Sequence, residues 1–167
     1  MKIRKSSIAD KDRILNIFET AKQYMITHGN ATQWNKEYPG IDIVENDIND
    51  GNSYVLVDND EIVGTFSFII GYEETYQKII NGNWRKNKLY GTIHRLASNG
   101  KVKGIAKACF DFCTFQIDYV RIDTHPNNIS MQSAILKYGF KECGNIFVHD
   151  GSIRIAYDWF NDKETIK

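Results

Sequence analysis

YGTIHRLASNGKVKGIA, residues 90–106, is the stretch of sequence that decides the fold of this chain. It reads as an apolar strand over residues 90–97, a small basic loop over 98–104, and the start of a helix at Ile105. A glycine-bearing loop between a strand and a helix collects unpaired backbone N–H groups at the positive end of the helix dipole. This arrangement favours the binding of a phosphate group.

The flanking sequence supplies further strands and helices. After this stretch comes a strand over 119–123, and residues 124–128 lead into a helix that ends at Gly139. We further expect one helix over 8–27 and a shorter one over 40–50, the first opened by a capping box between Ser7 and Asp10. The remaining expected elements are a strand over 2–5, a hairpin over 53–57 and 62–70, a polar, aromatic-rich surface excursion over 71–89, and a second hairpin over 141–148 and 152–159. The sequence predicts a single α+β domain over residues 1–167, with a mixed sheet.

The amino-acid composition argues against some classes of function. The 167 residues are 42% hydrophobic, enough for one globular domain with a sizeable core. Lys+Arg and Asp+Glu both total 21, so no net charge recruits nucleic acid or an anionic membrane. The N-terminus has no signal-peptide pattern, and no apolar run approaches the roughly 18 residues that span a bilayer. We therefore expect a cytoplasmic protein with neither nucleic acid nor membrane as a partner.

The three cysteines, an odd count, argue against a disulfide framework. Cys109 and Cys113 are one helical turn apart, which would suit either a metal pair or two buried thiols. Because no second pair of ligands has a matching spacing, we expect buried thiols and no metal.

The loop over 98–104 has two interpretations when it is taken alone. It could bind phosphate, or it could simply connect a strand to a helix, with solvated lysines. The spacings of a Walker P-loop and of a dinucleotide-binding fingerprint are both absent. The ordered set is more specific: strand, Lys-x-x-Gly-x-Ala, amphipathic helix, strand, Asn, helix and Gly-Phe. This set resembles the GNAT superfamily of acyl-CoA-dependent N-acetyltransferases over nearly the full length.

The resemblance implies a mostly antiparallel sheet of six to seven strands with a splayed parallel pair, flanked by about four helices. It also implies that acetyl-CoA is the co-substrate, with its pantetheine arm lying between the two parallel strands. The family's contacts then fall on the main chain of His94, Arg95 and Leu96 and on Asn128, and its pyrophosphate loop maps onto Lys101, Val102, Lys103, Gly104, Ile105, Ala106 and Lys107. Lys101 departs from the Arg or Gln that the family carries at that position.

For the chemistry, the resemblance implies a direct attack of an amine on the thioester, with the Leu96 amide as oxyanion donor. Asp123 lies where some relatives carry a general base, and His94 or His125 could serve instead. Alternatively, Asp123 caps the turn that follows it and His125 is only a surface neighbour. Many relatives have a Tyr seven residues after the Asn to protonate the coenzyme A thiolate, but this chain has Ile135 there. Tyr138 is nearby and is not assigned this role.

The acceptor pocket of this family is framed by the first two helices and the excursion. In these segments, aromatic rings and carboxylates could bind a cationic amine. The candidate acceptor residues are Gln33, Trp34, Glu73, Glu74, Tyr76 and Trp84. Alternatively, Trp34 and Trp84 pin long loops to the core. Two other functions remain open, a non-catalytic acyl-CoA sensor and a plain nucleotide-binding protein. A homodimer through the C-terminal hairpin is a further expectation.

Overall fold

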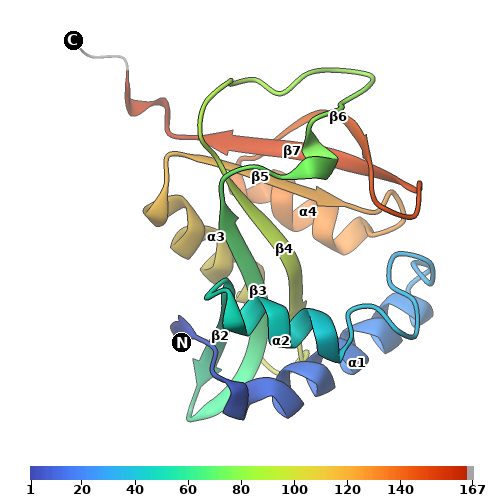
Figure 1. Cartoon of the computed structure of the whole chain (residues 1–167), viewed down its shortest axis with the longest axis vertical. Helices are drawn as coiled ribbons and strands as arrows, with labels where there is room; N and C mark the ends of the chain where they lie inside the picture. Colours follow the sequence, from blue (N-terminus) through green and yellow to red (C-terminus); the bar gives the residue numbers. More distant parts are fainter. Residues whose placement is uncertain (165–167) are drawn as a thin grey trace. The chain divides into compact units, whose positions relative to one another are not determined.

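A computed structural model describes residues 1–164, which form one seven-stranded sheet and four α-helices (Figure 1). The strand order is β1-β2-β3-β4-β5-β7-β6. The strands are β1 (Lys2–Lys5), β2 (Ser53–Asp58), β3 (Glu61–Ile70), β4 (Gly91–Ser98), β5 (Tyr119–Thr124), β6 (Lys141–Phe147) and β7 (Ile153–Phe160). The helices are α1 (Lys11–Thr27), α2 (Ile41–Asn49), α3 (Ile105–Gln116) and α4 (Ile129–Tyr138). The predicted mixed sheet with four helices is confirmed.

The chain divides into two compact units. The first unit contains Met1–Phe68 and His94–Cys109, and the second contains Ile69–Ile93 and the chain from Phe110 onward. Both β4 and α3 are continuous elements that contribute residues to each unit. The single domain over residues 1–167 stays a prediction.

In the first unit, local sequence signals determine where the elements begin and turn. The capping box is present: the Asp10 carboxylate accepts from the Ser7 backbone N–H at 2.8 Å, and a 3-10 turn leads into α1. The β2–β3 hairpin turns at Asn59 and Asp60, whose φ angles of 47° and 62° match the left-handed residues of a tight hairpin. Both predictions are therefore confirmed.

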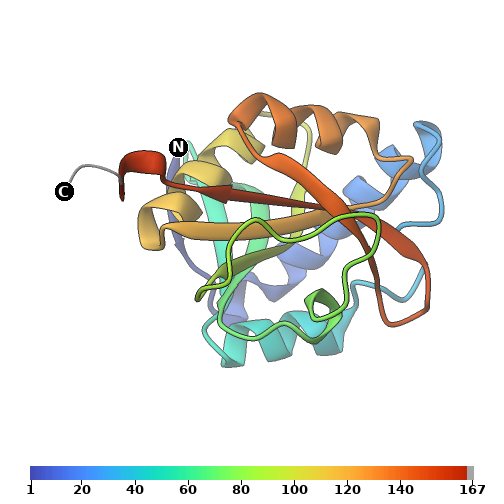
Figure 2. The same ribbon diagram turned by 90° about the horizontal axis from the view of Figure 1, so that it is seen from above.

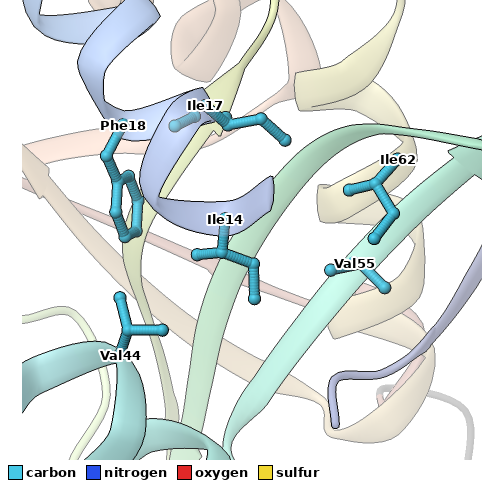
Figure 3. Packing of buried hydrophobic residues seen from close by; sticks show 7 residues of the cluster. Ile14, Ile17, Phe18, Val44, Val55 and Ile62 are labelled. Atoms are coloured by element: carbon cyan, nitrogen blue, oxygen red, sulfur yellow. The ribbon is translucent and has the colours of Figure 1, made fainter. Parts of the chain in front are cut away.

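The core of the first unit lies between α1, α2 and the β2–β3 hairpin. Figure 3 shows the apolar side chains that meet there. Ile14 and Phe18 come from one face of α1, as their spacing of four residues requires, and Val44 faces them from α2. The cluster consists of Ile14, Ile17, Phe18, Val44, Val55, Ile62 and Ala97. Since Ala97 belongs to β4, this core supports the second half of that strand.

The second unit contains the parallel pair. The described register of β4 with β5 runs from Gly91 opposite Val120 to Ile93 opposite Ile122, and β5 then pairs with β7 in the antiparallel sense. α4 ends at Tyr138 and is capped by Gly139, whose φ of 118° confirms the predicted stop. The parallel neighbours on which the resemblance depends are thus present.

The segment over 71–89 differs from the expected surface excursion. Tyr76 is 1% exposed and joins the core of the second unit with Tyr90, Tyr119, Ile146 and Ala156. The segment also pairs with β6: Ile80 and Asn145 exchange two backbone hydrogen bonds of 2.9 and 2.8 Å. Figure 2 shows this segment in green as a long loop with one short helical turn. The expectation was wrong at Tyr76, because the sequence around this residue is polar and does not indicate that its ring is deeply buried.

Candidate functional site

The backbone of β4 is irregular just after the stretch whose register pairs it with β5. Arg95 has a φ of 54°, in the left-handed region that residues other than glycine rarely adopt. Its neighbours His94 and Leu96 are both half-buried. The three residues that the resemblance assigned to main-chain contacts therefore surround a bulge-like distortion, which redirects the backbone polar groups of the strand.

The side chain of Arg95 is clamped inside the first unit. Its guanidinium donates to both carboxylate oxygens of Asp47 on α2, at 2.7 to 3.0 Å, and to the Tyr38 hydroxyl at 3.3 Å. Burial alone would lower the pKa of Arg95, but Tyr38 and Asp47 outweigh it, so this pKa lies above its ordinary value. Ser67 also donates to Asp47, at 2.6 Å. The charge at position 95 thus takes part in a largely buried ion pair.

The loop after β4 leaves a run of backbone donors without partners. The N–H groups of Gly100 and Lys101 are bonded to the side chains of Ser98 and Asn99. Within residues 1–164, the next five N–H groups, Val102 to Ala106, have no hydrogen-bond partner, and the helical ladder of α3 begins with Ala108 bonding to Gly104. Five successive donors at the start of a helix fit a diphosphate well.

Two glycines shape this loop in different ways. Gly104 has a φ of 84° and open space where a Cβ would lie, so its backbone conformation requires glycine while the surrounding packing does not. A Cβ on Gly64 of β3 would come within 2.9 Å of Ile105 Cγ2, so Gly64 allows the first residue of α3 to pack closely on the strand. Ile105 is itself buried and fixes where the helix begins.

The lysines of the loop differ in what they contact. The ammonium of Lys101 lies 2.7 Å from Glu61, and both side chains are exposed. Lys103 and Lys107 are exposed as well. At the position where the family has Arg or Gln, this chain therefore carries a surface ion pair, which is worth little to stability.

In the second unit, Asp123 receives a hydrogen bond from a buried tyrosine. The Tyr76 hydroxyl donates to the Asp123 carboxylate at 2.7 Å. Burial, and then the Asp123 charge, raise the pKa of Tyr76 well above its usual range, so this hydroxyl keeps its proton. The Trp84 indole donates to the Tyr76 carbonyl at 2.9 Å and holds the segment in place. The Asp123 side chain thus bonds to the 71–89 segment. The alternative role of Asp123, as a cap of the turn that follows it, did not predict this contact.

His125 and Asn128 shape the turn into α4. The Nδ1 atom of His125 accepts from the Asn127 backbone N–H at 3.0 Å, which places the proton of the neutral ring on Nε2. Burial, and then the nearby Arg154, lower the pKa of His125. Asn128 is the N-cap of α4, and its side-chain oxygen accepts from the Met131 N–H at 3.2 Å.

The predicted acceptor residues have contacts of their own. Arg121, 6% exposed, lies with its guanidinium carbon 3.9 to 5.1 Å from the ring centroids of Trp84, Tyr90 and Tyr119. The cation that these rings receive is thus supplied by the chain itself. Trp34 packs edge-on against Phe18. For both tryptophans, these contacts favour the alternative of pinning loops to the core.

The other acceptor and acid candidates also have defined surroundings. Glu73 caps a short 3-10 turn by accepting from Thr75, and Glu74 is exposed. Ile135 is fully buried, and the Tyr138 hydroxyl bonds to Thr114 and Asp111 of α3. All three cysteines are buried. Among the described residues there is no cluster of three or more His, Cys, Asp or Glu side chains suited to a metal ion, and no helix long and apolar enough to cross a membrane.

Sequence reasoning missed the partners of Arg95. Asp47 is 48 positions away from it, and Tyr38 is 57 positions away. No motif joins them, since each is a polar residue in a region that the pattern assigned to helix two or to the preceding loop. The only available signal was a charged residue inside an otherwise apolar strand.

Comparisons place the chain among known structures. The sequence matches no protein-family model and no curated protein. An acetyltransferase of the GNAT family from Streptococcus agalactiae 2603 is 30% identical, with 97% of this chain and 96% of that chain covered and a TM-score of 0.89. A putative acetyltransferase from Staphylococcus aureus Mu50 is 27% identical, with 96% and 99% covered and a TM-score of 0.70. The NatC complex, solved with Gag peptide and CoA, shares the fold at 15% identity, with 96% and 99% covered and a TM-score of 0.60.

Proposed function

The chain belongs to the GNAT family of acetyltransferases, and we propose that it transfers the acetyl group of acetyl-CoA to a primary amine of a small molecule or peptide. The acceptor amine attacks the thioester carbonyl directly, without a covalent enzyme intermediate. Membership in the family supports acetyl transfer in general. The amine acceptor and the direct route follow from the family resemblance, and the burial of all three cysteines disfavours a covalent intermediate on a thiol.

The observation that carries the proposal is the run of unpartnered N–H groups from Val102 to Ala106. A diphosphate needs several donors that converge without side-chain rearrangement, and a glycine-containing loop at a helix start supplies them. These groups, with Lys103 and Lys107 near the surface, would hold the pyrophosphate of acetyl-CoA. The ion pair of Lys101 with Glu61 leaves the backbone as the main source of binding.

The reaction has a simple balance of bonds. The amine nitrogen forms a C–N bond to the acetyl carbon, the C–S bond breaks, and coenzyme A leaves as a thiolate that takes a proton from water. The N–H of Leu96, which directly follows the distorted Arg95 backbone, is our candidate donor to the developing oxyanion. The proton lost from the amine passes to a base on the protein.

For that base we propose Asp123, with Tyr76 as the group that orients it. The hydrogen bond from the Tyr76 hydroxyl fixes one carboxylate oxygen, and a protonated tyrosine cannot compete for the substrate proton. His125 is a weaker candidate because its Nδ1 accepts from Asn127 and its Nε2 carries the proton. His94, on the half-buried part of β4, stays an alternative base, and Asn128 stays a candidate contact for the cofactor arm.

The test is an assay of the purified protein with acetyl-CoA and a panel of primary amines, including polyamines, amino sugars and peptide N-termini. We expect release of free thiol, together with a product heavier by one acetyl group. Calorimetry with coenzyme A should show binding whether or not the right amine is in the panel. Tight binding with no turnover across a broad panel would favour the sensor alternative. Equal protection from thermal unfolding by ATP and by coenzyme A would favour a nucleotide-binding protein.

A further inference from the structure

Arg95 stands apart from the other non-glycine residues with a positive φ. Among the described residues these are Asn59, Asp60, Asn81 and Arg95, and only Arg95 lies within a strand. Asparagine and aspartate tolerate the left-handed conformation because their short polar side chains bond locally, whereas arginine has no such advantage. Something outside the backbone must therefore hold Arg95 in this state.

The contacts of the side chain identify what holds it. Three hydrogen bonds of 2.7 to 3.0 Å join the guanidinium to the Asp47 carboxylate, and the Tyr38 hydroxyl accepts a fourth at 3.3 Å. The two charged side chains are 11% and 15% exposed, so solvent screens the pair only weakly. Ser67 of β3 donates to the same carboxylate at 2.6 Å. The strand is thus tied to α2 at the residue where its backbone is distorted.

We propose that Arg95 is a positioning residue, whose clamp on Asp47 holds the β4 backbone in the left-handed conformation and thereby aims the Leu96 N–H at the thioester oxygen. The inference rests on the proposed function, because it assigns the Leu96 N–H to the oxyanion. This positioning role differs from a direct electrostatic effect of the Arg95 charge on the reaction, because the guanidinium already bonds to Asp47 and Tyr38. The charge acts only through the backbone.

Glycine separates these two roles, because it adopts a positive φ at no steric cost. The experiment compares Asp47→Asn/Arg95→Gly with Asp47→Asn/Arg95→Ala, so that neither double variant buries an unpaired charge. At an ordinary strand position glycine is less stable than alanine. Once the clamp is gone, alanine can leave the left-handed region, so we expect the ordinary order, with an unfolding equilibrium constant about 2- to 5-fold larger for the glycine variant. This readout needs no enzymatic activity.

The kinetic comparison uses the same two proteins. Loss of an aligned oxyanion donor lowers kcat by about 100-fold, which we expect for the alanine variant, while the glycine variant should stay within about 5-fold of the wild type. The Kd for coenzyme A should differ between the two much less than kcat does, because the 102–106 donors that hold the diphosphate are untouched. Glu45→Gln is the matched control: Glu45 lies on α2, as Asp47 does, and the change breaks its 3.0 Å ion pair with Lys11 of α1 and should leave kcat unchanged.

Each outcome has a defined meaning. Equal losses of kcat in the glycine and alanine variants, or a glycine variant that is more stable than the alanine variant, would overturn the positioning role. Should neither double variant fold, Arg95→Lys keeps the charge without the two-pronged contact, and an unchanged kcat would overturn the proposal equally. If the wild type acetylates no amine, the proposed function fails, while the order of stability still decides whether the clamp holds the backbone.

Discussion

Replacing Gly104 with alanine tests whether the loop before α3 binds the diphosphate of acetyl-CoA. The φ of Gly104 is 84°, and no atom lies within 4 Å of the position that a Cβ would take, so the change causes no clash. The left-handed conformation costs an alanine about 1–2 kcal/mol. Gly100, four residues earlier, has a φ of 77° and equally open surroundings, so Gly100→Ala carries the same strain. The two variants form a matched pair in stability.

The two variants differ in whether the N–H groups at the strained position are available to bind a phosphate. Gly104 lies inside the run of unpartnered N–H groups, whereas the Gly100 N–H is already bonded to the Ser98 hydroxyl. If the chain relaxes at residue 104, at least one donor turns away from the phosphate. A hydrogen bond to a charged group contributes about 1.5–3 kcal/mol, which corresponds to roughly 10- to 100-fold weaker binding of coenzyme A. Gly100→Ala should change this Kd less than about 3-fold.

The assay is calorimetric titration of each variant with coenzyme A and with pantetheine, which has the same arm without the diphosphate. Gly104→Ala should weaken only the first ligand. Equal losses of affinity in the two variants, or an equal loss for pantetheine, would refute the assignment of the diphosphate to residues 102–106. Urea unfolding of both proteins checks that their stabilities match.

The remaining predictions concern the proposed base and the ionic contacts. Asp123→Asn should lower kcat by about 100-fold or more in steady-state assays while coenzyme A binding persists, and a retained kcat would remove this residue from the chemistry. Tyr76→Phe, which deletes only the orienting hydroxyl, should lower kcat by roughly 5-fold. Asp158→Ala removes a fully buried carboxylate that accepts from Arg85 and from the Tyr119 hydroxyl, and it should cost about 3 kcal/mol in urea unfolding. The arginine partner of Asp10 lowers the pKa of this carboxyl from 3.8 to about 2, so its stabilisation is complete above pH 4 and is lost as the pH falls toward 2. Asp10→Asn should thus cost about 1 kcal/mol at pH 7, discounted for the half-exposed arginine, and the difference from wild type should shrink in that acid window.

The elements were predictable because their signals are local. The Ser7–Asp10 box, the Asn59–Asp60 turn and Gly139 each act within a few residues, so the sequence shows where a helix starts, a hairpin turns or a helix ends. The geometry of the loop after β4 is accessible for the same reason, since its donors belong to consecutive backbone positions. Its assignment to the cofactor stays a prediction.

Side-chain partnerships were beyond sequence reasoning because they join distant positions. The Tyr76–Asp123 bond spans 47 residues, and composition around Tyr76 indicated a surface loop. The ring of Trp84 was open to a cationic substrate until the structure placed Arg121 against it. In the sequence, an aromatic ring that contacts a cation of its own chain looks the same as a ring that binds a cationic ligand.

The pairing of Ile80 with Asn145 affects how two copies of this protein could associate. β6 is the outermost strand at its end of the sheet, where a neighbouring molecule would ordinarily add its own strand. At Asn145 both the amide hydrogen and the carbonyl oxygen are already engaged by Ile80, and a Cβ at Gly144 would lie 2.5 Å from the Ile80 carbonyl. A homodimer through the C-terminal hairpin would therefore have to join by side-chain faces, since a continuous intermolecular sheet is blocked at this point.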